Sequence, residues 1–174
     1  ALNSKQKTGE STYSVKLNFA DELYTIHDFM VGRLQHFGII NEYKKHGAFL
    51  QYLGTDFGRK TYGDNVWGDI VKSKIAKLAD YGVRYVVIGD CRFKNEFDAF
   101  PDAYRIRLEA SKEVRQARCP AWRENDTHQS ETDLDMYTVD DKFDRYFFTG
   151  NISPEGCVEV ILEAIAQWDS RPPR

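Results

Sequence analysis

The stretch Val83-Arg84-Tyr85-Val86-Val87-Ile88-Gly89-Asp90 decides the fold class. Most of its residues are β-branched or aromatic, and its second half is almost continuously apolar, which is typical of a strand covered on both faces of a sheet. Before it, apolar residues recur at helical spacing over 64–81, and Gly82 follows as a helix-ending residue. The sequence therefore predicts a helix that leads directly into a buried core strand.

The same pattern continues on both sides of this strand. Further strands are expected at 15–19, 104–108 and 145–149. Helices are expected at about 20–37, 41–52, 64–81, 95–100, 111–119 and 154–168, with Ser111 as an N-cap. Strands that alternate with helices predict an α/β fold, with a parallel sheet covered by helices on both faces. The polar segment 121–144 has few apolar residues and is expected to be a mobile excursion.

Composition narrows the functional classes. The 174 residues include 24 Lys and Arg against 27 Asp and Glu, and 41% are hydrophobic, as in an ordinary globular protein. We expect one domain over 1–174. The net charge of −3 gives no electrostatic reason to bind nucleic acid or an anionic membrane. Without a long apolar run, a secretory signal or paired cysteines, the sequence favours a cytoplasmic location.

The first candidate site follows the core strand. Ligands of open α/β sheets gather at the carboxyl ends of strands, and here Asp90, Arg92 and Glu96 come directly after one. Arg92 could hold a phosphate while the two carboxylates orient its guanidinium, bind sugar or base, or meet the water shell of a metal. The alternative is an arginine–carboxylate cluster that only satisfies the end of the strand.

A second candidate site combines a glycine-containing segment with an aromatic residue. Gly54 and Thr55 lie where a helical run meets glycines, which would expose backbone N–H groups and a hydroxyl to an anion or a base. Trp67 could stack on a nucleobase, but on the sequence alone a place in the core is the favoured interpretation. An ordinary helix end is the alternative for the glycines.

A third candidate site contains several arginines. Arg115, Arg118 and Arg123 lie in and after the helix that Ser111 opens, next to the polar excursion. Arginines that flank a mobile polar segment suit a lid that closes over a polyphosphate and excludes water. A solvated helix face is the usual alternative. No proton-transfer role is assigned to His128.

In order and spacing, these clusters resemble the deoxynucleoside monophosphate kinases of tailed bacteriophages. The resemblance covers about Phe19 to Gln167. It rests on the following residues: Gly54-Thr55-Asp56, Trp67, the trio Asp90, Arg92 and Glu96, the run Thr127-His128-x-Ser130-Glu131, and Asn151.

The resemblance implies a P-loop fold like that of adenylate kinase, with a lid at about 111–144. It implies phosphoryl transfer from ATP, with Mg²⁺, to a deoxynucleoside monophosphate in the host cytoplasm. Gly54, Thr55 and Trp67 would border the base and sugar. The acceptor nucleotide would be held by Asp90, Arg92 and Glu96, and Thr127 would also bind substrate. Arg92, Arg115, Arg118 and Arg123 would be catalytic. No protein metal ligand is assigned, and a homodimer is left open.

One part of the family pattern is missing. The G-x-x-x-x-G-K-[ST] loop, which supplies the N–H cradle and the lysine for ATP, occurs nowhere in the sequence. Ala1-Leu2-Asn3 aligns with the end of the helix that normally follows this loop, so we expect about 20 to 30 further residues upstream, enough for a strand, the loop and a helix. The alternative function is a non-catalytic nucleotide-binding or assembly protein that has lost the loop.

Overall fold

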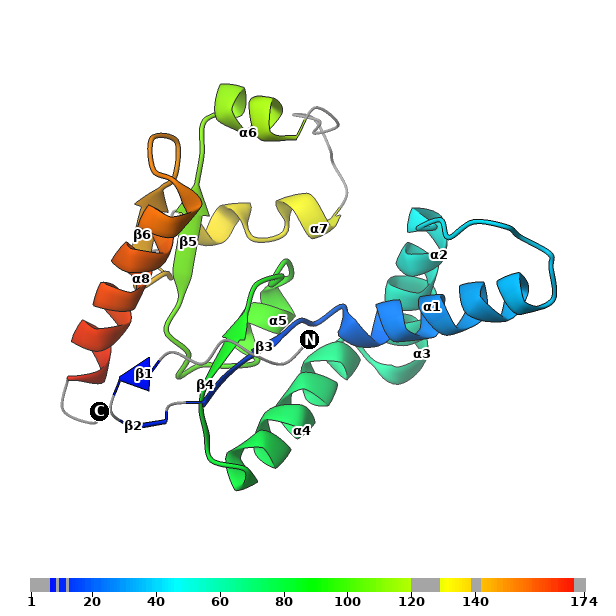
Figure 1. Ribbon diagram of the computed structural model, residues 1–174, viewed down its shortest axis with the longest axis horizontal. Coiled ribbons are helices and arrows are strands. Elements are labelled where there is room, and N and C mark those ends of the chain that lie inside the picture. The colour runs from blue at the N-terminus through cyan, green and yellow to red at the C-terminus, as the bar shows by residue number, and fades with distance from the viewer. Residues whose placement is uncertain (1–6, 9, 12, 120–128, 139–141, 171–174) are drawn as a thin grey trace. The chain divides into compact units, whose positions relative to one another are not determined.

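A computed structural model describes residues 7–8, 10–11, 13–119, 129–138 and 142–170 (Figure 1). The chain is a mixed α/β protein with two compact units, Ala1–Phe100 and Pro101–Arg174, and each unit is described here by itself. Within the described residues, none of the helices has the length and apolar character needed to span a membrane.

The sheet of the first unit is a parallel pair of strands. β3 (Tyr13–Leu17) pairs with β4 (Val83–Ile88), and Leu17 lies opposite Ile88 at the carboxyl end of the pair. A short antiparallel pair, β1 (Lys7–Thr8) and β2 (Glu10–Ser11), precedes them. α4 (Val66–Asp80) leads into β4 through Gly82, whose positive φ of 72° favours glycine. The predicted helix and strand at this point are confirmed.

The predicted burial of β4 on both faces is wrong. Val87 is 54% exposed, and Arg84 is exposed at the start of the strand. Side chains project from the two faces of a strand, and α4, which packs against β4, leaves these side chains only partly covered.

The helices of the first unit follow the prediction except in one region. α1 spans Asp21–His36 and α5 spans Lys94–Asp98. The predicted helix 41–52 begins later, with α2 (Gly47–Gln51), and then continues as a π-helix, η1 (Tyr52–Arg59), and a last turn, α3 (Lys60–Tyr62). Gly63, with φ 99°, ends the run. Periodicity at 3.6 residues does not predict the wider turn of a π-helix.

A buried histidine joins α1 to α2. His27 is fully buried, its Nδ1 lies 2.9 Å from Asp28 Oδ1, and its Nε2 accepts a hydrogen bond from the His46 backbone N–H at 3.1 Å. Since Nε2 accepts, the neutral ring carries its proton on Nδ1, directed at Asp28. The apolar core residues of this unit are Phe19, Val31, Leu53, Trp67, Val71 and Phe97.

The second unit has its own parallel pair. β5 (Ile106–Glu109) pairs in register with β6 (Arg145–Phe148). Ser111 is confirmed as the N-cap of α6 (Lys112–Arg118), and Ser153 caps α8 (Pro154–Asp169) by accepting from the Gly156 N–H at 3.1 Å. Between them lie α7 (Gln129–Thr132) and the 3₁₀ turn η2 (Asp135–Thr138).

The predicted architecture is therefore confirmed in part. Both strand pairs are parallel and connected through helices, as expected for an α/β chain. The described residues form three two-stranded sheets, the antiparallel pair β1–β2 and the parallel pairs β3–β4 and β5–β6, in place of the expected large sheet covered on both faces. A P-loop fold is not among the features of the described residues.

We predict that His27→Phe lowers the free energy of unfolding by about 1–2 kcal/mol, because a ring of similar shape cannot accept the His46 N–H bond or donate to Asp28. His36→Phe, at an exposed position in the last turn of the same helix, is the matched control and should change it by less than about 0.5 kcal/mol. Urea unfolding followed by circular dichroism measures both variants, and equal losses would contradict the role given to His27.

Candidate functional site

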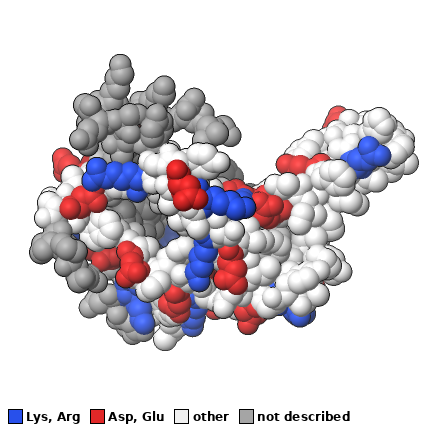
Figure 2. Space-filling view, turned by 90° about the horizontal axis from the view of Figure 1, so that it is seen from below, with Lys and Arg blue, Asp and Glu red and all other residues white. Residues whose placement is uncertain are grey.

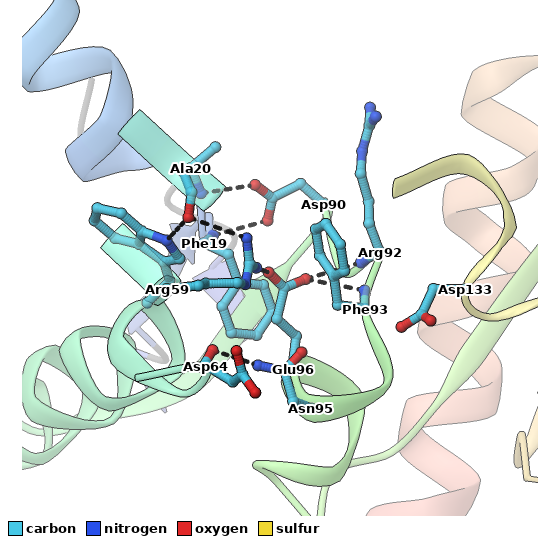
Figure 3. Close-up of polar contacts among 12 residues, drawn as sticks. Phe19, Ala20, Arg59, Asp64, Asp90, Arg92, Phe93, Asn95, Glu96 and Asp133 are labelled. Atoms are coloured by element: carbon cyan, nitrogen blue, oxygen red, sulfur yellow. Dashed lines mark hydrogen bonds and ion pairs between the residues drawn. The ribbon is translucent and has the colours of Figure 1, made fainter. Parts of the chain in front are cut away.

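Asp90 joins the carboxyl ends of the two strands in the first unit. Its Oδ1 accepts the Phe19 backbone N–H at 2.9 Å, and its Oδ2 accepts the Ala20 N–H at 3.0 Å (Figure 3). The turn after β3 is thereby held to the residue that follows β4, and α1 begins directly after this turn. Both carboxylate oxygens of Asp90 therefore accept backbone hydrogen bonds. This supports the alternative interpretation, in which Asp90 only satisfies the end of the strand.

Glu96 forms the centre of the site. Its side chain is 4% exposed, and Oε2 accepts the backbone N–H groups of Arg92 at 3.0 Å and Phe93 at 3.2 Å. Oε1 accepts a hydrogen bond from Arg59 Nη2 at 2.6 Å. Burial is the main influence on the pKa of Glu96 and raises it, while the Arg92 N–H bond and the Arg59 charge oppose this shift.

The expected orientation of the Arg92 guanidinium by Glu96 is therefore wrong. Glu96 holds the backbone of Arg92 and forms its ion pair with Arg59. The Arg92 side chain is exposed and extends away from the Glu96 carboxylate (Figure 3). The physical reason is local: Glu96 lies in the first turn of α5, where a carboxylate turns back to the N–H groups that open the helix.

Arg59 is the residue that the sequence analysis missed. It lies at the end of the π-helix, and its side chain is 11% exposed. Besides Glu96, it reaches the Gly54 carbonyl oxygen at 3.4 Å through Nη1, and its guanidinium lies over the Phe93 ring at 4.0 Å. The sequence held no usable signal for this contact, because the spacing of five residues from Gly54 brings the two together only in a π-helix.

Trp67 and the glycines of the π-helix belong to the same network. The indole Nε1 donates to the Gly54 carbonyl oxygen at 2.9 Å, so this oxygen accepts from both Trp67 and Arg59. Trp67 is buried, which agrees with the interpretation that the sequence alone favoured. A Cβ at Gly58 would overlap the indole ring of Trp67. Gly58 is therefore required for the packing of Trp67. Thr55, in the same π-helix, is half-buried.

The arginines of the second unit bind the carboxyl ends of its strands. Arg118 donates from Nη1 to the Thr149 hydroxyl at 3.0 Å and from Nη2 to the Thr149 carbonyl oxygen at 2.6 Å. Arg115 Nε donates to the Ala110 carbonyl oxygen at 2.9 Å. Ala110 and Thr149 directly follow β5 and β6. The two other predicted site residues of the excursion, Arg123 and Thr127, lie outside the described residues.

The described carboxylates of this site do not fit a resident Mg²⁺ ion. Both oxygens of Asp90 accept backbone N–H groups, Asp21 accepts from Asn18, and Glu96 accepts from Arg59 and two N–H groups. In the described part of the chain, no three His, Cys, Asp or Glu side chains are grouped so that they could hold a metal ion.

Comparison of the chain with protein-family models, with curated proteins and with solved structures found no match.

We predict that Gly58→Ala lowers the free energy of unfolding by about 1–3 kcal/mol, because the added methyl group overlaps the Trp67 indole. Gly32→Ala is the control: it also lies in a helix, but nothing lies within 4 Å of its added Cβ. There the better helix propensity of alanine should leave stability unchanged or raise it by about 0.5–1 kcal/mol. Thermal unfolding measures both variants. A Gly58→Ala protein as stable as the parent would contradict the close packing.

A second prediction concerns pH. Because burial raises the pKa of Glu96, the folded chain retains this proton over a pH range, just above the ordinary value of 4.5, in which the unfolded chain has lost it. Unfolding in that range releases a proton, so the stability contributed by Glu96 decreases as pH rises through it and is constant above.

Glu96→Gln removes this dependence. Urea unfolding of the parent and the variant between about pH 4 and pH 8 should give a difference in unfolding free energy that is largest at low pH. The difference, taken as parent minus variant, should become less favourable to the parent as pH rises and should level off toward neutral pH, because Gln has no carboxyl group to ionise in the buried site. A difference that grows with pH would show that the pKa shift has the opposite sign.

Proposed function

We propose that this chain is a deoxynucleoside monophosphate kinase, which transfers a phosphoryl group from ATP to a deoxynucleoside monophosphate. The observation that carries the proposal is the Arg59–Glu96 network. Arg59 and Glu96 are 37 positions apart, and they join Gly54, Trp67 and the backbone of Arg92, all of which the resemblance assigns to the acceptor site. A set of residues selected by their order in the sequence therefore shares one hydrogen-bonded network.

In this proposal, Arg92 is the residue that binds the phosphate of the acceptor. Its backbone is held by a buried carboxylate, at the carboxyl end of a parallel strand pair, and the residue as a whole is exposed. A guanidinium on a fixed backbone suits bidentate binding of a phosphate. By the resemblance, Arg115, Arg118 and Arg123 would neutralise the charge that develops on the transferred group, which would require Arg115 and Arg118 to release Ala110 and Thr149.

The proposed reaction needs no general base. An oxygen of the acceptor phosphate attacks the γ-phosphorus of ATP, the bond from that phosphorus to the β–γ bridging oxygen breaks, and ADP leaves with the electron pair. The products are ADP and a deoxynucleoside diphosphate. The protein contributes by positioning the two nucleotides and by placing positive charge near the phosphates, and Mg²⁺ arrives with ATP.

One observation favours the second candidate, a non-catalytic nucleotide-binding or assembly protein. The sequence contains no G-x-x-x-x-G-K-[ST] loop to cradle the phosphates of ATP. A chain of this kind would use the acceptor site without the transfer step. The two candidates share the acceptor site and differ in whether ATP is consumed.

Two measurements on the full chain separate these candidates. Isothermal titration with each deoxynucleoside monophosphate tests the acceptor site, and a coupled assay for ADP release with MgATP tests the transfer. ADP release that requires a monophosphate supports the kinase. Saturable monophosphate binding without ADP release supports the non-catalytic candidate. If no deoxynucleoside monophosphate binds, both candidates are wrong.

We predict that Arg92→Ala weakens binding of the preferred monophosphate about 10- to 100-fold, the effect of removing a charged hydrogen bond to phosphate. Its thermal stability should equal that of the parent, because the Arg92 backbone holds Glu96 in both proteins. Arg84→Ala removes an equal charge at the amino end of β4, away from the site, and should bind as the parent does. Unchanged affinity in Arg92→Ala would remove Arg92 from the site.

A further inference from the structure

Helix α1 has two apolar faces, and only one of them is covered. His27 and Val31, one turn apart, are buried on the face that contacts α2. The C-terminal half of the helix extends away from the β3–β4 sheet (Figure 1), and from Gly32 to Ile39 every residue is exposed. A helix with an apolar face turned to water is incompletely packed.

The uncovered face carries five large apolar side chains, which we call the α1 stripe. Their spacing of three or four residues places them on one side of the helix, next to the buried face. The stripe consists of Ile26 (37% exposed), Phe29 (67%), Met30 (45%), Leu34 (39%) and Phe37 (65%). Basic and acidic side chains lie among uncharged ones on the visible face of the projecting part of the molecule that contains α1 (Figure 2). A contiguous apolar patch of this kind marks an interaction surface.

The size of the stripe suits a protein interface. At roughly 200 Å² for a fully exposed side chain of this size, the exposed fractions correspond to about 500 Å² of apolar surface. Two such stripes in contact would bury about 1,000 Å² in total, which reaches the lower limit for a specific interface. A single scattered side chain would need no partner, but five on one face do.

The charged residues at the two ends of α1 indicate how a second copy of the helix would be oriented. Acidic residues, Asp21 and Glu22, lie in its first turn, and basic residues, Arg33 and His36, lie in its last turn. An antiparallel copy of the same helix opposes the two helix dipoles favourably, and it lays the two stripes over each other along their length, with Phe37 of one copy beside Ile26 of the other. A parallel copy would bring like charges together.

We propose that the α1 stripe is a dimer interface, on which the α1 stripe of a second copy of this chain packs antiparallel about a two-fold axis. The interface is isologous, so the same five side chains serve both copies. The inference rests on the surface of α1 alone and does not depend on the nucleotide proposal.

Sedimentation equilibrium of the full chain, over micromolar concentrations, tests this inference. We expect twice the mass of the chain for the parent. Met30→Glu places a charge in the middle of the stripe and should give the monomer mass, with the helical circular dichroism spectrum unchanged because Met30 is not a core residue. Gln35→Glu adds the same charge to an exposed position outside the stripe and should stay dimeric.

Phe29→Ser is a second variant that adds no charge, and it should weaken the dimer at least tenfold. A parent chain that is monomeric at these concentrations would overturn the proposal. So would a Met30→Glu chain that remains dimeric, or a Gln35→Glu chain that dissociates equally. Association of the parent into larger species without a defined dimer would also overturn it, because an antiparallel two-fold pairing closes at two copies.

Discussion

The ion pair between Arg59 and Glu96 is the constraint on which the first unit depends. Removing two charges from water costs several kcal/mol for each ion, and mutual attraction offsets this only where the remaining hydrogen-bonding groups are satisfied. Glu96 meets that condition with two backbone N–H groups, and Arg59 adds the Gly54 carbonyl and the ring of Phe93. These contacts fix the π-helix against the loop that follows β4. The proposed nucleotide site depends on that fixed loop, because the loop carries Arg92.

The sequence predicted correctly those helices and strands that depend on interactions between residues close together in the chain. α4, β4 and α8 follow from apolar periodicity, and Ser111 was identified as a cap because a cap needs only its own helix. The partner of Glu96 could not be predicted in this way. Arg92 is its near neighbour in sequence, but Arg59, 37 positions away, is its neighbour in space. The π-helix was not predicted because a repeat of 3.6 residues does not distinguish it from an α-helix.

The exposure of β4 and of α1 shows what an apolar pattern does and does not establish. The pattern of 83–90 predicts that the strand can be buried, but whether it is buried depends on neighbours that the pattern does not name. Among the described residues, β3 pairs with one edge of β4 and α4 packs against it, and Val87 remains half exposed. Phe29 and Phe37, in and directly after α1, are likewise apolar residues that the described neighbours do not cover. Apolar surface in excess of what a unit covers by itself is then evidence about association rather than about the fold.

Because β4 pairs with one strand among the described residues, its backbone N–H groups fall into two sets. Along a strand, successive N–H groups point to opposite edges, so those that face β3 are bonded while those that face the other edge have no strand partner among the described residues. Amide hydrogens of β4 should therefore exchange with deuterium at alternating slow and fast rates along the strand. If another strand pairs with that edge, exchange of the fast amide hydrogens should become slow.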